Sequence, residues 1–79
     1  MLNVINISNS ELIRAPLARR LVTGKNIVVF NIIDSEITNQ LNTGNKINYQ
    51  NELYEVMNKE AVLSPISYTK FNCTLYSTK

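Results

Sequence analysis

Histidine is absent from the 79-residue chain and Cys73 is its only cysteine, so the side chains that carry most enzyme chemistry are scarce. Without histidine, the chain can form neither a Ser-His-Asp nor a Cys-His triad and has no imidazole base. A single cysteine rules out a disulfide within this chain and, without histidine, a tetrahedral zinc site. We therefore expect a protein that is not an enzyme and that uses no cofactor, no metal and no small-molecule substrate.

The sequence Thr23-Gly24-Lys25 looks like part of a phosphate-binding loop but lacks the other residues of that loop. The loop also needs an earlier glycine, and a serine or threonine directly after the lysine to hold magnesium. Ala18, Arg19 and Asn26 occupy those places. We therefore do not predict nucleotide binding.

Two other features have the residue types for chemistry but the wrong setting for it. Asp34 and Glu36 are two residues apart, which makes them diverge on a helix or share an exposed strand face, so we expect solvated carboxylates. Cys73 alternates with Phe71 and Leu75, which predicts a small buried side chain. A reactive thiol would need an exposed, electropositive setting.

Charge is unevenly distributed along the chain, although the net charge is only +2. Residues 11–25 carry four basic residues and one acidic residue, whereas residues 34–60 carry two basic and five acidic residues. This pattern allows the basic segment of one copy to meet the acidic hairpin of the next, and such contacts close into rings when the rotation suits. The residues predicted to bind a partner are Arg14, Arg19, Arg20, Lys25, Glu52 and Glu55.

The apolar pattern predicts mainly β-strands. Residues 25–33 are rich in β-branched side chains and apolar at both alternating sets of positions, so we expect a strand buried on both faces. We expect a short strand at 2–7 and a last strand at 67–77, with Phe71, Cys73 and Leu75 facing inward.

The remaining segments are expected to connect these strands. Residues 9–21 should form an irregular or short helical connection, because Pro16 opposes a continuous helix. Asp34 should cap a helical turn over 35–41. Strands at 46–49 and 53–58 should form a hairpin through residues 50–52, and its charged side chains, Lys59 among them, should lie on a solvated face.

Both glycines of the chain, Gly24 and Gly44, directly precede a predicted strand. Glycine takes a positive φ at little cost, so we expect a turn at each. These elements predict a single domain over residues 1–79, a small antiparallel β-barrel or sandwich of SH3-like type. The N-terminal connection of that domain is expected to be short and helical or irregular.

The turn and hairpin at 43–56, followed by the strand at 68–76, resemble the second half of head-closure and head–tail connector proteins of tailed bacteriophages. The resemblance covers about half of the chain, and many SH3-like barrels share this hairpin. It implies a non-enzymatic virion component, assembled in the host cytoplasm and repeated around a ring in the neck or tail. Copies of the same chain and other virion proteins would be its partners, and no catalytic residue is carried over.

Two other classes of function stay open. A small phage-encoded inhibitor of a host defence protein would also be short and lack catalytic motifs. A nucleic-acid-binding barrel could use Arg14, Arg19, Arg20 and Lys25, but no aromatic residue is interleaved among them as a stacking platform, so this partner is not favoured. The sequence has no basic leader and no apolar run long enough for a membrane span, so no membrane partner is expected.

Overall fold

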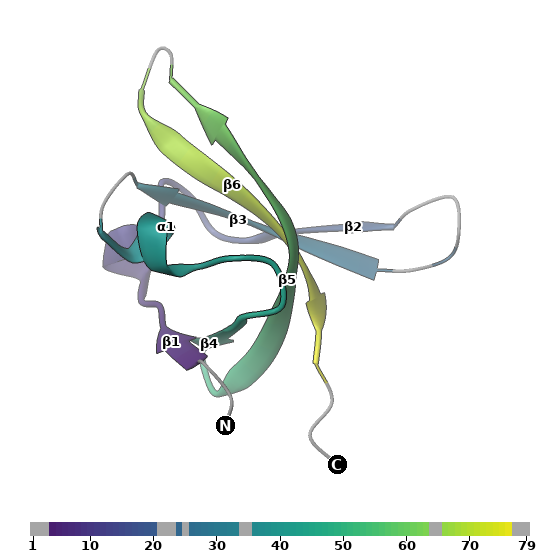
Figure 1. Cartoon of the computed structure of the whole chain (residues 1–79). Helices are drawn as coiled ribbons and strands as arrows, with labels where there is room; N and C mark the ends of the chain where they lie inside the picture. Colours follow the sequence, from purple (N-terminus) through teal and green to yellow (C-terminus); the bar gives the residue numbers. More distant parts are fainter. Residues whose placement is uncertain (1–3, 21–23, 25, 34–35, 64–65, 77–79) are drawn as a thin grey trace.

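The computed structural model describes residues 4–20, 24, 26–33, 36–63 and 66–76, and it contains one six-stranded mixed sheet (Figure 1). The strand order in the sheet is β1-β4-β5-β6-β3-β2. The mainly β fold expected from the sequence is therefore confirmed. The elements are β1 (Val4–Asn6), η1 (Asn9–Glu11), β2 (Leu17–Arg20), β3 (Asn26–Ile33), α1 (Glu36–Gln40), β4 (Lys46–Tyr49), β5 (Glu52–Val62) and β6 (Tyr68–Leu75).

Strand β3 is buried on both faces, as its apolar pattern predicted. Phe30 and Ile32 are fully buried on the face that carries the main core, and Val29 is 4% exposed on the opposite face. Strands β2 and β6 pair with β3 on its two sides, both antiparallel. These two strands satisfy the backbone groups of β3, while burial of both of its faces suits its mostly apolar side chains.

The expectation of a purely antiparallel sheet is wrong at one edge, because β1 pairs with β4 in parallel. After β1, the chain crosses from the side of β4 to β3 within a few residues. The Ile7 amide donates to the Asn48 carbonyl at 2.9 Å, and the Ile13 amide donates to the Asn31 carbonyl at 2.9 Å. Residues 7–13 thus connect β4 to β3 across the core, giving the sheet a barrel-like closure on that side.

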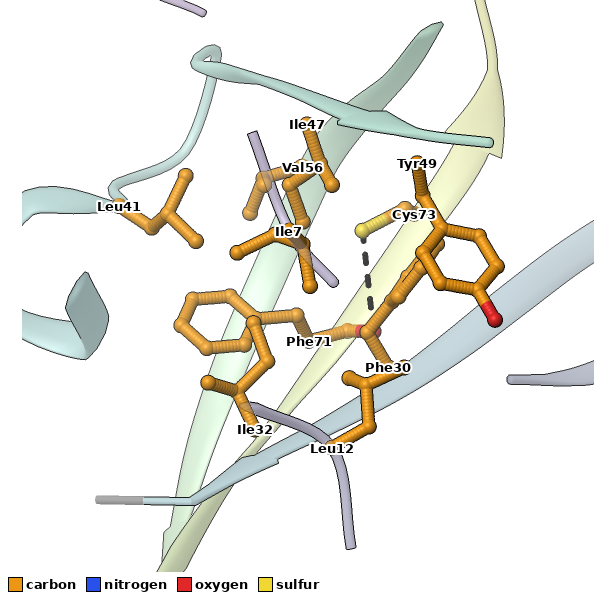
Figure 2. Packing of buried hydrophobic residues seen from close by; sticks show 10 residues of the cluster. All are labelled: Ile7, Leu12, Phe30, Ile32, Leu41, Ile47, Tyr49, Val56, Phe71 and Cys73. Atoms are coloured by element: carbon orange, nitrogen blue, oxygen red, sulfur yellow. Dashed lines mark hydrogen bonds between the residues drawn. The ribbon is translucent and has the colours of Figure 1, made fainter. Parts of the chain in front are cut away.

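The core lies inside this closure and is built from the inward side chains of β3, β4, β5 and β6 (Figure 2). Figure 2 shows Phe71 and Phe30 between the aliphatic side chains and Tyr49. Ile7 and Leu12 of the crossing segment join the same cluster. The cluster consists of Ile7, Leu12, Phe30, Ile32, Leu41, Ile47, Tyr49, Val56, Phe71 and Cys73.

The prediction of an irregular connection across residues 9–21 is wrong in its second half. The short helical part is η1, where the Ser8 amide donates to Glu11 Oε1 at 2.7 Å. After Pro16 the chain becomes strand β2, whose residues pair with β3. The free edge of β3 supplies the backbone partners that the local sequence alone did not indicate.

The turns follow the local chemistry that the sequence indicated. Gln50 and Asn51 have φ values of 51° and 67°, the pair of positive values found in a tight two-residue hairpin turn between β4 and β5. Gly24 and Gly44 have φ values of 88° and 94°. The predicted hairpin is confirmed, although β5 extends to Val62, beyond the predicted 53–58.

The other predicted elements are found with small changes. Strand β1 lies within the predicted 2–7, and α1 within 35–41; Asp34 and its proposed capping role lie outside the described residues. In β6, Phe71 and Cys73 are fully buried as predicted, but Leu75 is 58% exposed. The pairing of β6 with β3 ends at Cys73, so Leu75 lies past the part of the sheet that covers the core.

A β-bulge in β5 redirects one charged side chain. The register between β5 and β6 shifts between Val56 and Asn58, so Lys59 comes to lie opposite the core residue Phe71. The Lys59 ammonium group donates to the carbonyls of Thr38 and Leu41, at 3.3 and 3.0 Å, and to Asn42 Oδ1 at 3.2 Å. Lys59 is exposed, as predicted for this face, and in addition it holds the C-terminal end of α1.

We predict that Lys59→Met lowers the free energy of unfolding by about 1 kcal/mol, because the carbonyls at the end of α1 lose a charged donor at a partly exposed site. Urea denaturation followed by circular dichroism measures the change. Lys70→Met, which removes a lysine from β6, serves as the matched control. Equal losses in both variants would contradict a specific role for Lys59.

Candidate interaction surface

Residues 17–20 of the basic segment form an edge strand of the sheet. Arg19 lies in β2 opposite Ile27 of β3, and Arg20 ends the strand opposite Asn26. Lys25 lies outside the described residues. The irregular connection expected here is therefore wrong for residues 17–20, because backbone pairing with β3 fixes them as an edge strand.

Strand β2 is last in the strand order and has β3 on one side only. No other described strand lies along its second side, which leaves backbone amides and carbonyls at this edge without a strand partner. Leu17 is 56% exposed, and Arg19 is exposed on the same face of the strand. The edge thus combines free backbone groups with an apolar and a cationic side chain.

Arg14 precedes β2 and lines a cleft between the crossing segment, the start of β2 and the β4–β5 hairpin. The cleft is also lined by Pro16, Tyr49 and Tyr54. Both tyrosine rings pack edge-on against Phe30, with ring centroids 5.5 and 5.0 Å from its own. The Tyr49 hydroxyl donates to Asn9 Oδ1 at 2.5 Å. These contacts hold the aromatic wall of the cleft in place. Its residues come from segments far apart in the sequence, so no local pattern indicated it.

The two predicted acidic residues lie in different places on β5. Glu52 is exposed at the start of the strand, where its Oε1 atom accepts a hydrogen bond from the Tyr54 hydroxyl at 3.5 Å. Burial, and then the charge of Glu52, raise the pKa of Tyr54. Glu55 lines a separate shallow groove with Asn26, Gly44 and Leu75.

The predicted binding residues therefore do not form one site. Arg19 lines a third depression, with Ile27, Met57 and Asn58, on the face of the sheet opposite the main core. Arg14 shares its cleft with Tyr54, and Glu55 lies in the groove described above. Charged residues spread over three shallow depressions are better suited to broad surface contacts than to enclosing a small molecule.

An apolar surface that was not predicted from the sequence lies at the tip of the β5–β6 hairpin. Leu63 is 77% exposed and Ile66 is 58% exposed. Ile33, at the end of β3, is 42% exposed and lies in register with Tyr68 of this hairpin. The sequence did contain an indication of this surface, namely the apolar residues that follow the predicted strand 53–58. A longer predicted strand would have placed them at the tip of a hairpin.

One buried cation was also missed. Lys46 is only 8% exposed, and its ammonium group donates to the Gly44 carbonyl at 2.9 Å. The same group lies 4.8 Å from the centre of the Tyr76 ring, a cation–π contact. The side chain therefore stabilises the turn at Gly44 and holds the end of β6.

Cys73 matches its predicted role as a small buried side chain. It is fully buried, and its thiol donates a weak hydrogen bond to the Phe71 carbonyl at 3.7 Å (Figure 2). Burial raises the pKa of the Cys73 thiol from 9.0 to about 12. A group that stays protonated and buried is unsuited to nucleophilic attack.

Comparisons with protein-family models, with curated proteins and with solved structures gave no match to the chain. Among the described residues, no group of three or more His, Cys, Asp or Glu side chains is placed to hold a metal ion. In that same part of the chain, no helix has both the length and the apolar character to cross a membrane. The case for a function therefore depends on the surface of the molecule.

We predict that stability falls above about pH 9 in a way that depends on Cys73. Between pH 9 and 12 the unfolded thiol loses its proton while the folded thiol keeps it, so the unfolded state binds fewer protons and is favoured as the pH rises. Urea denaturation at pH 8, 9 and 10 should show a steeper loss in the wild type than in Cys73→Ala. Parallel pH profiles would contradict burial of the thiol.

Proposed function

We propose that this chain is a non-enzymatic structural subunit that acts through protein–protein contacts. In this proposal, copies of the chain and other virion proteins form a ring in the neck or tail of a tailed bacteriophage. The single observation that carries the proposal is the set of large apolar side chains exposed at the ends of the strands, away from the core.

Leu63 and Ile66 at the tip of the β5–β6 hairpin, with the nearby Ile33, form the strongest part of that surface. Fully burying one such side chain contributes about 1.5–3 kcal/mol. Three partly exposed side chains therefore supply roughly 3–5 kcal/mol, while association costs at least about 4 kcal/mol. The gain from one copy's tip is about as large as the least cost of association, so this tip alone gives a marginal contact with a partner, which favours an assembly where each subunit makes several contacts.

Charge provides a second kind of contact. Arg19 lies beside Asn58, beyond the bulge of β5, whereas Glu52 and Glu55 lie before the bulge. Arg19 thus lies on a different surface from Glu52 and Glu55, so one copy can present its basic edge to the acidic surface of the next. Contacts between unlike surfaces are the type that closes into rings.

The placement in a virion derives from the resemblance of residues 43–56 and 68–76 to connector proteins. The turn at Gly44, the β4–β5 hairpin and strand β6 have the order that this resemblance requires. The SH3-like character of the barrel stays part of the proposal. A small inhibitor of a host defence protein stays the alternative, and it differs in being active as a monomer or dimer.

We predict that Ile66→Asp and Leu63→Asp each reduce assembly, because a charge at the hairpin tip opposes burial there. Size-exclusion chromatography with light scattering measures the mass of the assembled species. Ser10→Asp is the control, since Ser10 is exposed on η1 and the variant adds the same charge outside the surfaces proposed for contact. A wild-type chain that stays monomeric at high concentration, alone and with a purified connector ring, would contradict the ring proposal and favour the inhibitor.

We further predict that Arg19→Glu combined with Arg20→Glu weakens the oligomer, and that Glu52→Lys with Glu55→Lys restores part of it. Each exposed ion pair contributes at most about 1 kcal/mol, so a clear effect requires pairs repeated at every interface. The thermal stability of each variant is measured in dilute monomeric samples as a control. If the reversal and the rescue appear there as well, the charges interact within one chain and the prediction is wrong.

A further inference from the structure

We propose that the free edge of β2 accepts an extended acidic segment of a partner protein as an additional β-strand. The inference rests on the proposed function in one respect, that the chain acts through protein contacts. It assigns to one edge of the sheet a mode of binding and a partner chemistry.

The backbone of β2 provides the first argument. All four residues, Leu17–Arg20, are extended and pair with Asn26–Val29 of β3. In an antiparallel pair, the backbone groups of alternate residues point to opposite sides of the strand. One set in β2 therefore bonds to β3, and the other set points to the side where the described sheet ends. An extended peptide satisfies both amides and carbonyls at such an edge.

The side chains of β2 select the chemistry of the incoming strand. Leu17 and Arg19 are both exposed and share one face of the strand. Cross-strand neighbours on the same face interact directly, so this pair favours a partner with an apolar residue two positions from a carboxylate.

A second copy of β2 fits this edge poorly. Antiparallel pairing of Leu17–Arg20 with itself brings two basic strands side by side and gives Arg19 no carboxylate on the neighbouring strand. Charged side chains on edge strands are also a common protection against pairing of identical edges. The arginines thus oppose self-pairing while favouring an acidic strand.

The other edge of the sheet offers less. Strand β1 has only three residues, Val4–Asn6, and none of them is charged. A nucleic acid is also a poorer occupant of the β2 edge, because phosphates only accept hydrogen bonds and would leave the outward carbonyls unpaired. Within β2, Leu17 and Ala18 precede Arg19, and neither provides an aromatic ring for base stacking.

The experiment is a nuclear magnetic resonance titration of the ¹⁵N-labelled full chain. The probe is a capped ten-residue peptide, Thr-Val-Thr-Glu-Thr-Val-Thr-Glu-Thr-Val, which favours an extended conformation and places valine and glutamate two positions apart on one face. Its counterpart with lysine in place of glutamate tests the charge preference. Two further versions carry N-methyl groups on one or the other set of alternate residues, which blocks their amide donors and leaves the charges intact.

We expect the acidic peptide to shift the amide signals of Leu17–Arg20 and to slow hydrogen exchange at alternate amides of this strand. The lysine peptide should not bind, and at least one N-methylated peptide should lose binding. Arg19→Gln should weaken binding about two- to fivefold, the range for one exposed ion pair. Lys70→Gln, which changes the net charge equally on β6, should leave binding unchanged.

Several results would overturn the inference: no saturable shift at millimolar peptide, equal binding of both N-methylated peptides, or shifts centred away from β2. Tighter binding of a thymidine oligonucleotide with a steep loss in salt would replace the acidic strand by a nucleic acid. Light scattering on the same samples separates the two proposals. Assembly without peptide binding refutes strand addition alone, whereas binding by a strictly monomeric chain refutes the ring alone.

Discussion

Strand β3 is the constraint on which the rest of the structure depends. It pairs with β6 over most of its length and with β2 on its other side, while Leu12 forms a bridge to Ile32 near its end. Phe30, near the middle of the strand, contacts the rings of Tyr49 and Tyr54 from the β4–β5 hairpin. Because both faces of β3 must be covered, the segments around it are drawn into one closed core.

The same constraint explains the surface. A chain of this size buries only a limited share of its surface, and its main core consists of ten side chains. Strands that run past this core carry their apolar residues into solvent, as Leu63 and Leu75 show. The edge at β2 arises similarly, because β3 has a second side but the chain supplies only one short strand to fill it. Exposed ends and a free edge are the features from which contacts with other proteins can be built.

Features that depend on neighbouring residues were predictable. The turn at Gln50 and Asn51, the positive φ of both glycines and the burial of Cys73 follow from local conformational preference and alternation. The placement of the basic residues was not predictable in the same way: Arg14 lines a cleft and Arg19 lies on an edge strand. Their separation from one another, and the apolar tip at Leu63 and Ile66, were not foreseen, because they depend on strand length and register.

By itself, the sequence determined the alternation of apolar residues in the strands, the turns, the burial of β3 on both faces and the scarcity of catalytic side chains. Each of these depends on residue type and short spacing. The tertiary structure alone decided that β1 pairs in parallel with β4 and that residues 17–20 form a strand on β3. It also decided, through the bulge before Asn58, that Lys59 reaches the end of α1. Pairing between distant segments is fixed by which arrangement covers the core and satisfies backbone groups, and no local pattern encodes that choice.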